Sequence, residues 1–77
     1  MVIGVDIAKR AARRLGKRVR ELRIARQLSQ EELAFELDVD RSYISSLECG
    51  QRNPTLKTLA YLAGSLKITI AELCDGI

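Results

Sequence analysis

A short stretch rich in hydrogen-bond donors, between Asp40 and Gly50, carries the clearest chemistry in this sequence. At helical spacing, its apolar residues Ile44 and Leu47 face inward and the polar residues between them face outward. The outward side chains are those of Arg41, Ser42, Tyr43, Ser45 and Ser46. Such side chains donate hydrogen bonds to phosphates and to the edges of bases. The stretch therefore predicts a helix that binds a nucleic acid.

A shorter helix that begins after Ser29 must position this stretch. Ser29 is an N-cap residue and Glu32 follows three positions later, which makes a capping box. Leu33, Ala34 and Leu37 then lie on one face at helical spacing. The pattern predicts a second amphipathic helix, packed on the same core.

The turn between these two helices spans residues 38–40. Asp38 interrupts the helical pattern, and Asp tolerates the left-handed conformation of a tight turn better than most residues. We expect Val39 to fill the core and the Asp40 side chain to cap the second helix. Gly50, just past the end of that helix, suits a left-handed C-cap. The prediction is two helices joined by a tight turn.

This segment resembles the helix-turn-helix of the phage-repressor (Cro/C1 or Xre) family of DNA-binding proteins. The likeness extends from about Leu15 to Leu73, and residues 40–45 with Arg52-Asn53 look most like the small controller proteins of restriction–modification systems. It implies an all-α fold, a compact five-helix bundle with a helix-turn-helix as in lambda-repressor-like DNA-binding domains. The matching residues are SQEELA at 29–34, Val39, SYIS at 42–45, Leu47, Glu48, Gly50, RNPTL at 52–56, Leu59 and Ala60.

The resemblance implies roles for individual residues in binding double-stranded DNA. Gln30 would contact the DNA backbone and brace Arg41. An Arg fork matches O6 and N7 of guanine, worth about 1–3 kcal/mol of discrimination, but Arg41 could instead bind a phosphate. Ser42 and Ser46 would reach bases only if the helix docks closely, and Ser45 would face either DNA or solvent.

Tyr43 has two interpretations: contact with a thymine methyl or a phosphate, or a partly buried ring beside Phe35. Arg52 and Asn53 lie in the loop that follows the donor-rich helix. In relatives this loop runs along the DNA backbone, so the resemblance assigns both residues phosphate contacts.

An ion pair and a dimer are also implied. Relatives commonly tie the first helix to the recognition helix by an Arg–Glu pair, and Arg23 and Glu48 occupy the matching positions. Dimerisation in the family usually uses the C-terminal helices, although the same apolar residues could simply close the monomer core. The candidate interface residues are Leu66, Ile68, Ile70 and Leu73.

The remaining helices follow from periodicity. A first helix is expected over residues 6–27, with Leu15, Val19 and Leu22 inward. Gly16 interrupts it, either where an extra N-terminal segment joins or at a point of close packing. A helix capped by Thr55 is expected to reach residue 66. Its predicted inward stripe is Leu56, Leu59, Ala60 and Ala63, broadened by Leu62 and Leu66. A capping box at residues 69–72 starts a last short helix.

The 77 residues predict one domain, with an N-terminal extension and the start of the first helix over residues 1–10 and the helix-turn-helix domain over residues 11–77.

Charge is distributed unevenly along the chain. Residues 1–26 carry nine Lys or Arg against two acidic residues, whereas residues 27–77 carry four against eight. This basic end is either an electrostatic footprint for nucleic acid or a solvated amphipathic helix.

Several classes of function are disfavoured. The chain has no His and only two Cys, so we expect no metal site and no cofactor. No nucleophile–base pair or phosphate-binding Gly-rich loop indicates an enzyme. No apolar run approaches the roughly 20 residues that span a membrane, and no signal peptide is evident, so we expect free thiols and a cytoplasmic protein. The short chain leaves no room for a small-molecule effector domain.

The predicted function is a sequence-specific transcription regulator that binds an inverted-repeat operator as a homodimer, most concretely a restriction–modification controller. One alternative is an antitoxin-type autorepressor that also binds a partner protein, through Val2 and Ile3 or the C-terminal helix. Another is a helical adaptor that keeps the fold without binding DNA. Salt-dependent retention on DNA separates the adaptor from the two regulators.

Overall fold

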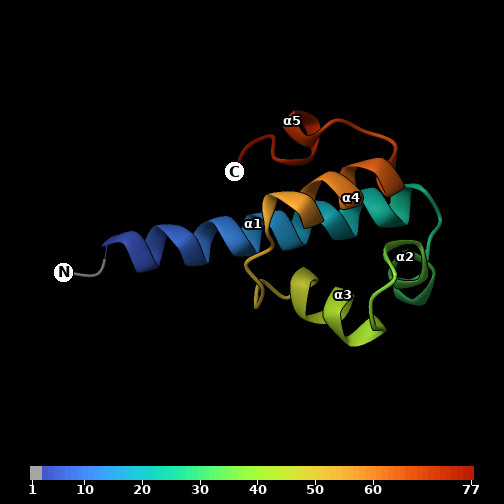
Figure 1. The fold of residues 1–77 in the computed structure, drawn as a ribbon. Coiled ribbons are helices and arrows are strands. Elements are labelled where there is room, and N and C mark those ends of the chain that lie inside the picture. The colour runs from blue at the N-terminus through green and yellow to red at the C-terminus, as the bar shows by residue number, and fades with distance from the viewer. Residues whose placement is uncertain (1–2) are drawn as a thin grey trace.

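The structure is a computed structural model that describes residues 3–77, including all of their side chains except those of Ile3 and Val5. Within this range the chain forms five helices and no strand (Figure 1). The helices are α1 (Ile3–Ala25), α2 (Gln30–Leu37), α3 (Arg41–Glu48), α4 (Leu56–Leu66) and α5 (Ile70–Leu73). The predicted all-α, five-helix bundle is confirmed. The expectation for Val2 lies outside the described residues.

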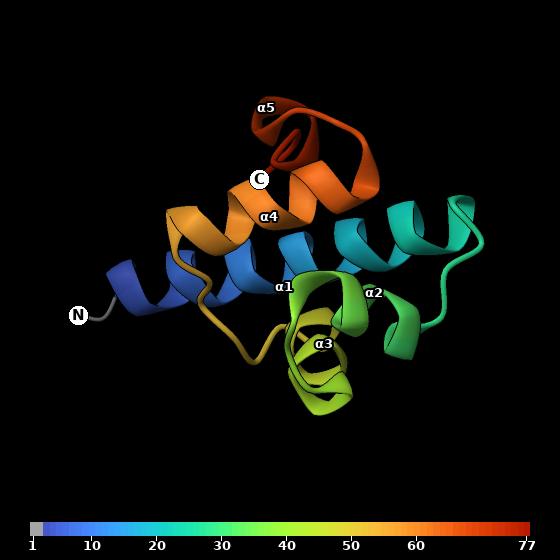
Figure 2. The same ribbon diagram turned by 45° about the vertical axis from the view of Figure 1, so that its right-hand side comes forward.

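The long helix α1 is the axis of the domain. In both views α4 runs alongside it, α2 and α3 lie on the other side, and α5 caps the α4 side (Figures 1 and 2). The N-terminal half of α1 projects beyond the other helices, as Figure 1 shows. This projection lengthens the molecule to 40 Å, against 24 and 20 Å in the other directions.

The core is aliphatic and draws on every helix. It confirms the inward positions predicted for Leu15, Val19, Ile44 and Leu47, all of which are buried. The full set of buried apolar residues is Leu15, Val19, Leu33, Ala34, Ile44, Leu47, Leu62, Ala63, Leu66 and Leu73.

The predicted inward stripe of α4 is wrong at two positions. Leu56 is 69% exposed and Ala60 is exposed, whereas Leu62 and Leu66 are buried. The helix LKTLAYLAGSL is apolar around most of its circumference. Periodicity alone therefore could not decide which side meets the core.

Local sequence determines several helix ends as predicted. The Ser29 hydroxyl accepts from the Glu32 N–H at 3.0 Å, and the Glu32 carboxylate accepts from the Ser29 N–H at 2.8 Å. That backbone hydrogen bond lowers the pKa of Glu32 below the usual carboxyl value. Thr69 and Glu72 form the same capping box at α5, and the Thr55 hydroxyl caps α4.

Three non-glycine residues adopt the left-handed conformation where helices end: Gln27, Asp38 and Lys67. Asp38 does so with φ of 57°. Gln27 also has φ of 57°, which ends α1 at Ala25 instead of residue 27. Helix α1 starts at Ile3, earlier than the expected residue 6. Val39 does not fill the core: it is 37% exposed, and its N–H donates to the Ala34 carbonyl.

Gly16 marks a point of close packing between α1 and α3. A Cβ atom at this position would lie 2.4 Å from the Leu47 carbonyl oxygen and 2.7 Å from that of Glu48. Only a residue without a side chain allows the end of α3 to approach α1 so closely. The contact fixes where the donor-rich helix sits on the body of the domain.

Candidate nucleic-acid interface

The N-terminal end of α3 presents unpaired donors to solvent. Arg41 and Ser42 are exposed, and within residues 3–77 neither side chain has a hydrogen-bond partner. Ser45 is half-buried one turn later. Because Ile44 and Leu47 hold the opposite face in the core, these donors are displayed on a fixed support.

Asp40 does not cap α3 with its side chain, contrary to expectation. Its backbone has the extended conformation of an N-cap residue, with φ −72° and ψ 149°, but its carboxylate accepts no capping hydrogen bond. The first N–H groups of α3 therefore lack a side-chain cap. The Tyr43 N–H donates to the Asp40 carbonyl at 3.0 Å. The N–H groups of Arg41 and Ser42, together with the helix dipole, attract anionic groups such as phosphates.

The C-terminal end of α3 is tied to α1 by the predicted ion pair. Arg23 Nε donates to Glu48 Oε2 at 2.6 Å and Arg23 Nη2 donates to Glu48 Oε1 at 3.0 Å. The two side chains are only 11% and 4% exposed. The hydrogen bond to Glu48 raises the pKa of Arg23 above its already high ordinary value, so the guanidinium stays charged. A third donor, Arg23 Nη1, reaches the Leu28 carbonyl at 2.8 Å.

Gln30 joins this ion pair and does not brace Arg41 as expected. Its Nε2 donates to Glu48 Oε1 at 3.1 Å. The carboxylate of Glu48 therefore accepts hydrogen bonds from α1 and from the first residue of α2. This network holds the three helices in one arrangement, and a contact between Gln30 and DNA stays a prediction.

A cluster of three residues links α3 to the following loop, and the sequence did not indicate it. The Ser46 hydroxyl donates to the Tyr43 carbonyl and accepts from Arg52 Nε, each at 3.0 Å. The Arg52 guanidinium carbon lies 5.3 Å from the centre of the Tyr43 ring, a cation–π contact. Tyr43 is half-buried and packs against the core, as one of its two interpretations predicted, but its expected neighbour Phe35 is 87% exposed. Ser46 thus positions Arg52, and a base contact from its hydroxyl would break this arrangement.

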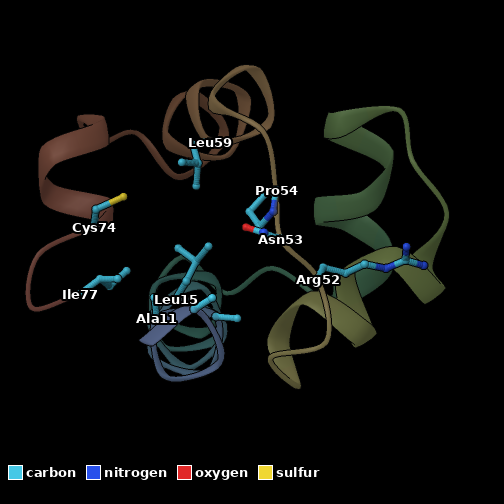
Figure 3. A pocket seen from close by; sticks show the side chains of 10 residues that line it. Ala11, Leu15, Arg52, Asn53, Pro54, Leu59, Cys74 and Ile77 are labelled. Carbon is cyan, nitrogen blue, oxygen red and sulfur yellow. The ribbon is translucent and has the colours of Figure 1, made fainter. Parts of the chain in front are cut away.

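Figure 3 shows where the loop goes next. Arg52 extends toward α3, away from a small groove between α1, α4 and α5, while Pro54 and Leu59 point toward that groove. The groove has a volume of about 160 Å³ and is mostly apolar. Asn53 lies beside Pro54 at the edge of the groove and is exposed.

Both cysteines are free thiols, as predicted. Cys74 is half-buried in the lining of the groove and Cys49 is exposed.

Two of the four residues predicted for a dimer interface lie in the monomer core. Leu66 and Leu73 are 3% and 0% exposed, so they close the core. For these two residues the alternative interpretation, that they close the monomer core, is confirmed. Ile68 packs against the core and is half-buried, and Ile70 is 37% exposed. Only Ile70 retains a largely accessible apolar surface among the four.

Across the part of the chain that the structure describes, no three His, Cys, Asp or Glu side chains come together as metal ligands would. None of the helices between residues 3 and 77 is both long and apolar enough to cross a bilayer.

Comparisons with known proteins agree with this geometry. A family model described as "Helix-turn-helix" matches residues 19–73. Control protein C.MunI from a Mycoplasma species is 42% identical over 65 residues, which cover 83% of this chain and 88% of that protein. Control protein C.BamHI from Bacillus amyloliquefaciens is 39% identical over 61 residues, covering 78% and 75%. The crystal structure of the restriction-modification controller protein C.AhdI from Aeromonas hydrophila matches with a TM-score of 0.80 at 46% identity, covering 84% of this chain and 94% of that one.

Proposed function

Because this chain belongs to the helix-turn-helix family of DNA-binding transcription regulators, we propose that it binds an inverted-repeat operator as a homodimer through α3. The family consists of regulators and not of enzymes. The observation that supports α3 as the reading element is the pair of exposed, unpaired donors Arg41 and Ser42 on a helix fixed by core packing and by the Arg23–Glu48 pair.

Each candidate residue has a role in this proposal. Arg41 reads a guanine in the major groove, with Ser42 and Ser45 beside it. Gln30, Tyr43 and the loop residues Arg52 and Asn53 contact the DNA backbone and set the position of α3. Ser46 and the Tyr43 ring hold Arg52 in place, which leaves both terminal nitrogens of its guanidinium free for a phosphate.

Replacement of Arg41 by Ala is expected to weaken binding to each half-site about 5- to 150-fold, the equivalent of about 1–3 kcal/mol, and to relax the preference at one base pair of each half-site. Selection of genomic fragments by the purified protein at moderate salt, followed by titration of the enriched repeat, measures both effects. Lys57→Ala removes the same charge from α4, outside the proposed reading helix, and serves as the control. A uniform loss on all sequences would instead assign Arg41 to a phosphate.

The dimer is proposed because an inverted repeat requires two-fold symmetry in the protein. The recognition helices of such a dimer lie about 34 Å apart, one turn of DNA. On α5, Ile70 offers exposed apolar surface next to a well-ordered capping box. We place Ile70 in the contact between protomers.

Replacement of Ile70 by Glu is expected to shift the protein to monomers and to lower operator affinity, because a carboxylate would be buried at the interface. Sedimentation equilibrium measures the monomer–dimer constant directly. The neighbouring Ala71→Glu adds the same charge to the same exposed helix and should leave the dimer intact. A dimer that survives Ile70→Glu would place the interface elsewhere on the domain.

The genes under control are proposed from the relatives. Two of the similar proteins are named control proteins, and the solved structure is of a restriction-modification controller protein. We therefore expect the enriched repeat upstream of this protein's own gene, beside genes for a methyltransferase and a restriction endonuclease. Enrichment near unrelated promoters would retain the regulator and reject the restriction–modification circuit.

A further inference from the structure

We propose that the projecting N-terminal half of α1 is a second DNA-binding site, which contacts the phosphate backbone of DNA next to the half-site that α3 reads. The site is a basic stripe, defined here as Lys9, Arg13 and Lys17. It adds a contact to the proposed function and so rests on that function. Its ligand is the sugar–phosphate backbone, without preference for base sequence.

The three residues of the basic stripe recur at intervals of four along α1, so they lie on one face of the helix. All three are exposed. At 1.5 Å per residue, neighbouring charges are separated by about 6 Å along the helix axis. That distance is close to two phosphate steps of one DNA strand, about 7 Å along the duplex.

Three arginines in α1 or just after it hold the fold together: Arg18 donates to the Glu72 carbonyl at 2.8 Å, Arg23 pairs with Glu48, and Arg26 donates to the Ser65 carbonyl. Among the described residues, Arg10, Arg14 and Arg20 of α1 make no contact of this kind. The basic stripe has no such partners. Among the residues that the structure describes, none of its side chains lies within 4 Å of a carboxylate or donates a hydrogen bond to the protein. Its positive charge is therefore available to an external anion.

The basic stripe lies next to the loop proposed to follow the DNA backbone. Gly16 packs against the last turn of α3, and Arg13, one turn earlier, lies against Gly50: a Cβ on Gly50 would be 2.7 Å from Arg13 Cγ. Lys9, a further turn out, lines a surface hollow together with residues 50–53. The stripe therefore runs from the body of the domain, where Arg13 lies against Gly50, outward to Lys9, toward the part of α1 that projects past the other helices (Figure 1).

A solvated, inert face would account for the charge but not for its placement. The rest of the domain is acidic: residues 27–77 carry eight Asp or Glu against four Lys or Arg. Residues 27–77 include α3, and their net negative charge is repelled by DNA, which is a polyanion. Binding therefore needs positive charge from another part of the domain. The basic stripe supplies that charge beside the loop after α3.

The test compares two double variants that remove the same charge from the same two turns of α1. K9Q/R13Q removes part of the basic stripe, and R10Q/R14Q removes two arginines from the adjoining face. Gln has a helix propensity close to that of Lys and Arg, and the Cγ atom of residue 13 is kept. Operator affinity is titrated from 50 to 200 mM salt, on a duplex limited to the operator and on one extended by a helical turn at each end.

Loss of two phosphate contacts in each protomer, four per dimer, is expected to reduce the slope of log affinity against log salt by about 3.6 for K9Q/R13Q, which makes the affinity drop over this salt range about 150-fold smaller. The R10Q/R14Q slope should stay near that of the wild type, and operator preference should be unchanged in both. The extended duplex should bind more tightly than the short one only while the stripe is intact. Equal slopes for the two variants, with operator selection by the wild type retained, would overturn the α1 site alone. No operator selection by the wild type would overturn the proposed function and this site with it.

Discussion

Replacement of Gly16 by Ala is expected to destabilise the domain by about 1–3 kcal/mol, because α1 and α3 can no longer pack at their present distance. The added Cβ would lie 2.4 Å and 2.7 Å from two carbonyl oxygens of the last turn of α3. These are backbone atoms, so no side chain can rotate to relieve the overlap. Ala also favours the helix by about 1 kcal/mol relative to Gly. The cost of the clash must exceed this gain for the variant to be less stable than the wild type. The midpoint of urea denaturation measures the net effect.

Gly64→Ala in α4 is the matched control. A Cβ at Gly64 would meet no atom within 4 Å, so only the propensity term applies. This variant should be more stable than the wild type by about 0.5–1 kcal/mol. If Gly16→Ala stabilised the protein as much as Gly64→Ala does, the close contact between α1 and α3 would be refuted. Operator binding by Gly16→Ala should also weaken, since α3 would be displaced on its support.

Replacement of Glu48 by Leu is expected to cost about 3–5 kcal/mol, the largest loss from any single change considered for this chain. The substitution would leave the guanidinium of Arg23, which is 9% exposed, without its bidentate partner. It would also remove the acceptor of the Gln30 amide. The leucine could recover part of the packing but none of the charge compensation. Urea denaturation at neutral pH gives the free energy of unfolding.

The double variant Arg23→Met/Glu48→Leu separates charge from packing. A buried ion pair can often be replaced by apolar residues of similar size at little cost. The double variant should therefore be more stable than Glu48→Leu alone, and the difference gives the coupling energy of the pair. A loss below about 1 kcal/mol for Glu48→Leu would mean that solvent screens the pair as it does at a protein surface.

Features determined by nearby residues were predictable from the sequence. The capping boxes at Ser29 and Thr69 depend on side chains three positions apart, and both are present. The left-handed Asp38 and the inward Ile44 and Leu47 also follow from local pattern. The Arg23–Glu48 pair joins residues far apart in the chain, and only the family resemblance predicted it.

Features that depend on how the helices meet were not predictable in the same way. Helix α4 is apolar on several sides, so its pattern did not show that Leu56 faces solvent. From the sequence, the Gln30 side chain could have contacted either Arg41 or Glu48. The packing of α2 against α3 brings its amide to the Glu48 carboxylate. The contacts of Ser46 with Arg52 depend on the path of a loop, which periodicity does not describe.

The anchoring of α3 at its C-terminal end also has consequences for the kinetics of DNA recognition. A helix of eight residues is too short to persist alone in water, so α3 exists because Gly16, Glu48 and the core hold it. It therefore opens together with the domain and not as a separate unit. When the protein meets DNA, no ordering step delays docking of α3 and no ordering entropy is subtracted from the affinity. The rate of association is then governed by diffusion, orientation and electrostatic attraction.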